Sequence, residues 1–152
     1  MQFTVAFIGG GNMAGSLIGG LIAAGQPASA IRVAEPYEER AAWLRQHFGV
    51  TVGPAAQIVP GAQAIVLAVK PQQMGEAMAG FKPDAGATVI SIAAGVRLSA
   101  MRKALGEGLH YVRTMPNTPA LVGKGITGLY APAETPAAAR ALADHILKAA
   151  GQ

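Results

Sequence analysis

The fold of this 152-residue chain is decided by Val5-Ala6-Phe7-Ile8-Gly9-Gly10-Gly11-Asn12-Met13-Ala14-Gly15. An apolar strand runs straight into a Gly-x-Gly-x-x-Ala pattern and then into a helix, an order typical of loops that hold a dinucleotide diphosphate. Gly9 permits the tight turn out of the strand, and Gly11 lets the backbone approach the phosphates. Ala14, or Gly15 beside it, lets the helix lie close to the sheet. The backbone N–H groups at the helix start then face the anion.

A second apolar segment supports this interpretation. Residues 31–34 read Ile-Arg-Val-Ala and lead into Glu35, twenty residues after Gly15. An acid at this point of a nucleotide-binding fold accepts hydrogen bonds from the hydroxyls of the adenosine ribose. Glycine turns before helices also arise for steric reasons alone. With strand, loop, helix, strand and acid in register, we interpret the loop as a nucleotide site.

The rest of the chain alternates between strands and helices. We expect strands over residues 3–8, 31–35, 50–52, 64–69, 88–92, 110–113 and 125–130. The expected helices cover residues 13–24, 36–49, 72–79 and 99–105, with a brief helical turn after Pro54. A last helix is expected to be capped by the Thr135 hydroxyl and to carry Pro136 at its first position. This alternation predicts an α/β fold with a doubly wound, mostly parallel sheet of the Rossmann type. We expect residues 1–152 to form one dinucleotide-binding domain.

Ligands of such sheets bind at the carboxyl ends of the strands, which defines the candidate site. The candidate cofactor-binding residues are Ile8, Gly9, Gly10, Gly11, Asn12, Met13, Ala14, Glu35, Ala68, Val69, Lys70, Pro71, Ala93, Ala94 and Asn117. The small residues at 68 and 93–95 leave room for a flat ring and a ribose against the backbone. Lys70 is either an anion contact near the phosphates or a surface lysine held extended by Pro71.

A loop with two prolines is the second unusual feature. In residues 116–119, the prolines bracket Asn117 and Thr118 and fix the direction of their polar groups. The loop either orients the nicotinamide, or a substrate beside it, or forms an ordinary Asx turn. The sequence offers no evident general acid or base, so the catalytic residue is unknown. A hydride transfer tolerates that, because the cofactor supplies the reacting hydrogen.

The composition excludes several other classes. The formal charge is +4, but the twelve Lys and Arg residues are scattered, which gives nucleic-acid binding little support. No apolar run is long enough to cross a bilayer, and no leader precedes the first strand, so the expected location is cytoplasmic. The chain has no cysteine, and its three histidines lack metal-ligand spacing, so we expect no metal.

Four segments of the chain resemble the pyrroline-5-carboxylate reductase family. They are residues 8–14, 67–72, 91–96 and 113–120, and they follow the family's order over essentially the whole chain. The Ala-Val-Lys-Pro and Met-Pro-Asn-Thr-Pro motifs within them are far more specific than the glycine loop. The resemblance implies that NADPH or NADH reduces the C=N bond of the small molecule 1-pyrroline-5-carboxylate to give L-proline, the last step of proline biosynthesis.

The resemblance also implies what the chain lacks. Family members continue into an all-helical second domain that forms the dimer and supplies much of the substrate pocket. We therefore expect this chain to be the cofactor-binding half of a homo-oligomeric enzyme, weakly active or inactive alone. The family often uses NADPH, but Glu35 departs from that pattern, because a carboxylate repels a 2′-phosphate and accepts a diol. Arg40, one turn into the next helix, would compensate for this charge.

Two alternatives stay open. One is a dehydrogenase of the β-hydroxyacid or 6-phosphogluconate type, which shares a similar first strand and glycine loop. Residues 116–119 argue against it. The other is a non-catalytic NAD(P)-sensing module, in which cofactor occupancy controls the binding of a partner through an exposed apolar patch.

Overall fold

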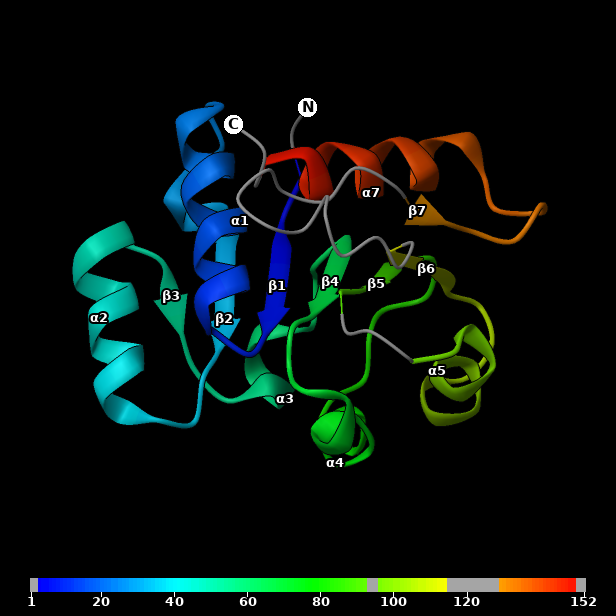
Figure 1. Cartoon of the computed structure of the whole chain (residues 1–152), viewed down its shortest axis with the longest axis horizontal. Helices are drawn as coiled ribbons and strands as arrows, with labels where there is room; N and C mark the ends of the chain where they lie inside the picture. Colours follow the sequence, from blue (N-terminus) through cyan, green and yellow to red (C-terminus); the bar gives the residue numbers. More distant parts are fainter. Residues whose placement is uncertain (1–2, 93–95, 115–128, 150–152) are drawn as a thin grey trace.

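The computed structural model describes residues 3–92, 96–114 and 129–149. Within these residues, seven strands form one sheet in the order β3-β2-β1-β4-β5-β6-β7 (Figure 1). The strands are β1 (Val5–Ile8), β2 (Ile31–Ala34), β3 (Thr51–Val52), β4 (Ala64–Leu67), β5 (Thr88–Ser91), β6 (His110–Thr114) and β7 (Leu129–Tyr130). The pairs from β3 to β6 are parallel, and β7 alone pairs antiparallel with its neighbour.

Helices connect these strands. The longer ones are α1 (Asn12–Ala23), α2 (Glu38–Phe48), α5 (Leu98–Leu105) and α7 (Ala137–Lys148). The shorter ones are α3 (Ala55–Ile58), α4 (Met74–Ala79) and two 3-10 turns, η1 (Ala28–Ala30) and η2 (Pro71–Gln73). Within the described ranges, no helix is long and apolar enough to cross a membrane.

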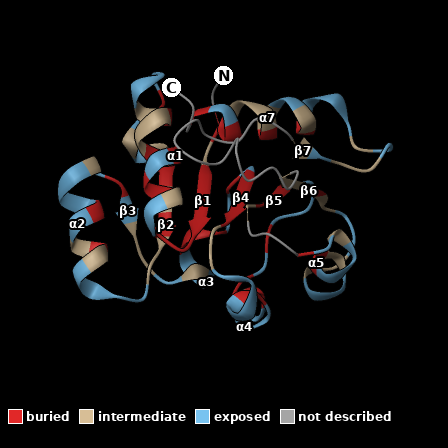
Figure 2. Cartoon of the chain, viewed as in Figure 1, coloured by how far each residue is buried: buried red, intermediate tan, exposed pale blue. Residues whose placement is uncertain are grey.

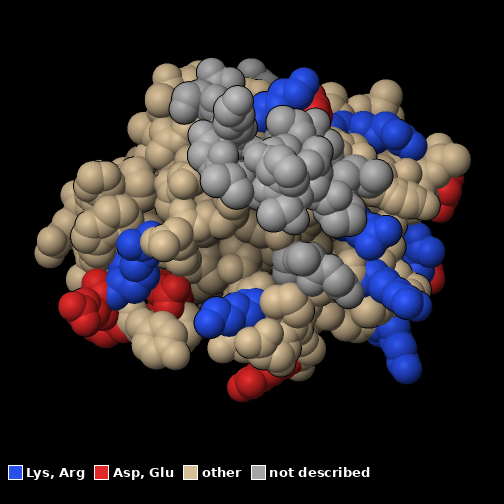
Figure 3. All heavy atoms as spheres, viewed as in Figure 1, with Lys and Arg blue, Asp and Glu red and all other residues tan. Residues whose placement is uncertain are grey.

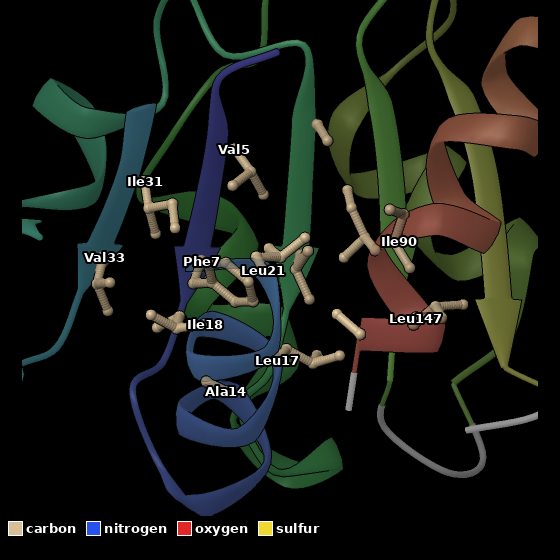
Figure 4. Packing of buried hydrophobic residues seen from close by; sticks show 14 of the residues in the cluster. Val5, Phe7, Ala14, Leu17, Ile18, Leu21, Ile31, Val33, Ile90 and Leu147 are labelled. Atoms are coloured by element: carbon tan, nitrogen blue, oxygen red, sulfur yellow. The ribbon is translucent and has the colours of Figure 1, made fainter. Parts of the chain in front are cut away.

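The central strands β1, β4 and β5 are buried on both faces, as their largely apolar runs predict (Figure 2). Along β1 the side chains alternate between two cores. Val5 and Phe7 pack in one core with residues of α1, α2 and α7, and Ala6 and Ile8 pack in another with residues of α3, α4 and α5. Figure 4 shows Leu17 and Leu21 of α1 in the first core. Because helices cover both faces of the sheet, a ligand can reach it only at the ends of the strands.

The strand ends are aligned. Ile8 at the end of β1 pairs in register with Ala34 of β2 and Leu67 of β4, and Leu67 pairs with Ser91 of β5. The loops that follow these strands therefore begin at one edge of the sheet, which we call the carboxyl edge. Because these strands are parallel and paired in register, residues far apart in sequence meet along this edge.

The structure confirms the predicted α/β fold and its mostly parallel sheet. Element ends shift by a few residues. The strand expected over 125–130 is seen as β7, and residues 125–128 lie outside the described residues. The cap expected at Thr135 is wrong, because α7 has no side-chain hydrogen bond at its start. Pro136 is the N-cap residue and not the first helical one, since its ψ of 147° is extended.

Candidate cofactor site

The turn out of β1 depends on Gly9. Its φ is +99°, and its N–H donates to the carbonyl of Ala34 at 2.8 Å. A Cβ on Gly9 would lie 3.0 Å from both the carbonyl oxygen of Ala68 and Cγ1 of Val69. The predicted tight turn is confirmed, and it packs against the residues that follow β4.

Gly10 fits into a crowded position under the loop. A Cβ there would lie 2.5 Å from Cδ1 of Leu44, a buried residue of α2. The N–H of Gly10 donates to Oε1 of Glu35 at 2.9 Å. The close approach of Leu44 and the hydrogen bond to Glu35 hold the loop against α2 and the end of β2.

Gly11 has open space around it. It is exposed and is the N-cap residue of α1, and apart from Gly11 and its two chain neighbours no atom of the described residues lies within 4 Å of a Cβ built there. Within that part of the chain, no side chain caps α1. The first-turn N–H groups of a helix have no partner inside the helix, so α1 offers its donors and the positive end of its dipole beside an empty space. An anion fits this arrangement.

Glu35 holds two backbone groups at once. Its Oε1 accepts from Gly10, and its Oε2 accepts from the N–H of Tyr37 at 3.0 Å. Each carboxylate oxygen can accept more than one hydrogen bond. The side chain is half-buried at the end of β2, where a ribose would meet it, so it can act as a structural residue and as a diol acceptor together.

Arg40 is the residue whose contacts the sequence did not reveal. Its Nε donates to the carbonyl of Gly10 at 2.6 Å, and its Nη2 lies 3.2 Å from the carbonyl oxygen of Gly11. Its guanidinium lies over the ring of Trp43, 4.2 Å from the centroid. The sequence signal was a basic residue one turn into the helix that follows Glu35.

Two small residues of α1 have different roles. Ala14 is fully buried in the core beneath the sheet face, which confirms its expected role in close packing. Gly15 instead faces α2, and a Cβ there would lie 3.0 Å from Nη2 of Arg40. The missing side chain of Gly15 therefore leaves room for Arg40 and does not serve the close packing of α1 on the sheet.

The other candidates continue along the carboxyl edge. Ile8 is buried, Met13, Ala68 and Val69 are half-buried, and Asn12, Lys70 and Pro71 are exposed. The N–H of Ala68 donates to the carbonyl of Ile8 at 2.8 Å. Lys70 has an extended ψ of 150° before Pro71, which begins η2. This geometry agrees with the restriction a proline imposes and leaves both interpretations of Lys70 open. Ala93, Ala94, Asn117 and Thr118 lie outside the described residues.

A cavity of about 260 Å³ lies at the β6–β7 side of the sheet. It is lined by Arg97, Leu98, Ser99, Arg113 and Tyr130. Figure 3 shows acidic side chains gathered where α2 begins and basic side chains gathered over α5 on the opposite side. The guanidinium of Arg113 lies 5.3 Å from the centroid of the Tyr130 ring. This side of the edge is suited to negative charge.

Two of the histidines, His47 and His145, make aromatic contacts. His47 stacks on Trp43 with centroids 4.6 Å apart, and His145 contacts the ring of Phe3 edge-on at 5.7 Å. Among the described residues, no group of three or more His, Cys, Asp or Glu side chains is placed to hold a metal ion.

Comparison with known proteins gives a consistent result. Residues 4–95 match the model of the family described as "NADP oxidoreductase coenzyme F420-dependent". The pyrroline-5-carboxylate reductase of Pseudomonas aeruginosa is 44% identical over 97% of this chain and 55% of its own length. The enzyme of that name from Vibrio alginolyticus is 38% identical over 97% of this chain and 56% of its own length.

A solved structure agrees with these relatives. The pyrroline-5-carboxylate reductase from Coxiella burnetii superposes with a TM-score of 0.87 at 34% identity, covering 99% of this chain and 57% of that one. The chain thus spans about half the length of the curated relatives it matches. It belongs to the family described as coenzyme F420-dependent NADP oxidoreductases, and its resemblance to pyrroline-5-carboxylate reductases, first indicated by its motifs, is confirmed.

Proposed function

We propose that this chain is the cofactor-binding half of a pyrroline-5-carboxylate reductase that uses NADPH or NADH. The whole protein would reduce the C=N bond of 1-pyrroline-5-carboxylate to give L-proline, the last step of proline biosynthesis. The observation that carries the proposal is the open space at Gly11, at the start of α1, beside a tightly packed turn. The curated relatives bearing this enzyme name support the choice of reaction.

The residues present fit a dinucleotide. Gly9 and Gly10 are packed by neighbours, whereas Gly11 faces space that a Cβ would partly fill. The first turn of α1 would bind the diphosphate through backbone N–H groups, and Glu35 would accept the ribose hydroxyls. Ala68 and Val69 lie next along the edge, and the small side chain of Ala68 would leave room there for the ribose and ring of the nicotinamide half.

When bound, the cofactor supplies the hydride. This hydride would reduce the imine carbon of the substrate, and the ring nitrogen would gain a proton, which gives L-proline. The chain's own part is to orient the two reactants. We propose that Asn117 and Thr118 orient the nicotinamide or the substrate, and that the small residues Ala93 and Ala94 leave room for the ring.

The rest of the protein completes the proposal. An all-helical second domain would form the homo-oligomer and supply much of the substrate pocket, and the enzyme would act in the cytoplasm. The two alternatives have less support. The names of the relatives favour a reductase over a β-hydroxyacid dehydrogenase or a sensor module.

The test compares this chain with a version extended through the helical domain. NADH and NADPH are titrated into both, with nicotinamide fluorescence as the readout, and proline formation is assayed. We expect both versions to bind the cofactor and only the extended one to turn over. A chain that binds neither dinucleotide, or an extended version that does not reduce 1-pyrroline-5-carboxylate, contradicts the proposal.

A further inference from the structure

We propose that Arg40 is a positioning residue for the cofactor diphosphate. Its guanidinium orients two peptide groups of the glycine loop so that their N–H groups face the phosphates, and it does not itself contact a phosphate. The inference rests on the proposed function, because it concerns the same site.

The first step is the pair of contacts to the loop. Arg40 donates to the carbonyl of Gly10 through Nε at 2.6 Å and to that of Gly11 through Nη2 at 3.2 Å. One planar guanidinium therefore holds two consecutive carbonyl groups. A lysine carries its three N–H donors on one nitrogen and lacks the rigid planar fork, so it would not hold both carbonyls in the same geometry.

The second step follows from peptide geometry. No peptide bond in the described residues is cis, and in a trans peptide the C=O and N–H groups point in opposite directions. Drawing the carbonyl of Gly10 toward Arg40 therefore turns the N–H of Gly11 away from α2. The carbonyl of Gly11 also accepts from the N–H of Gly15 at 2.8 Å, so Arg40 and α1 together turn the N–H of Asn12 the same way. These are the groups that border the open space at Gly11.

The third step is that Arg40 is itself held in place. Trp43, three residues later on α2, lies under its guanidinium at 4.2 Å from the ring centroid. Gly15 leaves the room that the side chain needs, since a Cβ there would lie 3.0 Å from Nη2. On the other side of the loop, Glu35 holds the N–H of Gly10. The loop is thus fixed at Gly10 by two side chains, because Glu35 accepts from its N–H and Arg40 donates to its carbonyl.

The arrangement also argues against Arg40 as a ligand of a 2′-phosphate. Two of its nitrogens already donate to loop carbonyls, and one face is covered by Trp43. Turning toward a ribose phosphate would release both carbonyls. A positioning residue affects every ligand that carries the diphosphate, whereas a 2′-phosphate ligand affects NADPH alone.

The test uses Arg40→Lys and Arg40→Gln, with Arg45→Gln as the matched control. Arg45 lies on the same helix but contacts Glu38 and the carbonyl of Val52, away from the loop. Dissociation constants are measured for NADH, NADPH and ADP. We expect both Arg40 variants to raise the dissociation constants of all three ligands by a similar factor of at least about tenfold. Arg45→Gln should change these constants by less than about twofold.

A measurement without cofactor separates this inference from the proposed function. ¹⁵N relaxation and amide exchange at Gly11 and Asn12 are compared in the free wild-type protein and in Arg40→Lys, after circular dichroism has shown both folded. We expect these two amides to become more mobile in the variant. Two results would overturn the inference. One is that the Arg40 variants lose affinity for NADPH but not for NADH or ADP. The other is that neither the affinities nor the mobility of the Gly11 and Asn12 amides changes. A wild-type chain that binds no dinucleotide overturns the proposed function, and the amide data still decide whether Arg40 orders the loop.

Discussion

Gly9 and Ala68 lie against each other where β1 and β4 end, so close that a Cβ on Gly9 would come within 3.0 Å of the Ala68 carbonyl oxygen. Gly9 also has a φ of +99°. We expect Gly9→Ala to lower the free energy of unfolding by roughly 2–4 kcal/mol, since backbone strain and overpacking add. Denaturation in urea measures the loss.

Gly86→Ala is the control for this change. Gly86 has a φ of +84°, but no atom of the described residues lies within 4 Å of a Cβ there. That variant carries the backbone strain without the close contact, and we expect a loss of about 1 kcal/mol. Equal losses at the two positions would show that the approach of Ala68 adds nothing.

Gly11→Ala separates stability from binding. The φ of Gly11 is −74°, which alanine adopts freely, and a Cβ there meets no atom of the described residues. We expect the free energy of unfolding to change by less than about 1 kcal/mol. NADH affinity should fall at least about tenfold, because the methyl group enters the space for the diphosphate. Normal affinity measured by nicotinamide fluorescence would remove Gly11 from the site.

Glu35→Gln tests the choice between the two cofactors. We expect the wild-type chain to bind NADH more tightly than NADPH, because the carboxylate repels a 2′-phosphate. The neutral variant keeps one oxygen acceptor. We expect it to lower the ratio of the NADPH to the NADH dissociation constant by about fivefold or more. The control is Glu39→Gln, a change in the exposed first turn of α2. The same ratio of dissociation constants in wild type and Glu35→Gln would refute the assignment.

The ionisation of the Tyr111 hydroxyl should make the fold less stable at alkaline pH. Burial raises the pKa of its hydroxyl above the usual 10.0; the nearby Arg102 opposes this rise, and Glu107 adds to it. The hydroxyl donates to the carbonyl of Gly106 at 2.6 Å. Because the folded-state pKa is the higher one, this group stabilises the fold fully below pH 10 and loses that contribution as the pH rises through the folded-state pKa.

Tyr111→Phe measures that contribution. We expect the wild type to be more stable than the variant by about 1 kcal/mol at pH 7, from the lost hydrogen bond. The difference in unfolding free energy should then shrink above pH 10. A difference that stays constant from pH 7 to pH 11 would contradict the assignment.

The sequence predicted the parts of this fold that depend on local pattern. The continuous apolar run of β4 and the glycine turn at Gly9 follow from hydrophobicity and backbone sterics, and both are seen. The cap at Thr135 was wrong because Pro136 takes an extended ψ, which delays the helix by one residue. A local pattern does not reveal that choice.

Arg40 illustrates a deeper limit. Its position on α2 was predictable, but the direction of a long side chain depends on its three-dimensional neighbours. The gap at Gly15 and the ring of Trp43 belong to two different helices, and they fix the guanidinium together. Contacts between residues 25 positions apart, such as Arg40 and Gly15, are set only once the sheet has brought α1 beside α2.

The stacking of Trp43 on Arg40 gives the molecule an optical property of its own. Trp43 is the single tryptophan of the chain, so all of its indole emission arises beside the group that holds the glycine loop. A shift in that emission on adding a ligand would come from this corner alone. The protein therefore carries an intrinsic, label-free sensor of events at the start of α1.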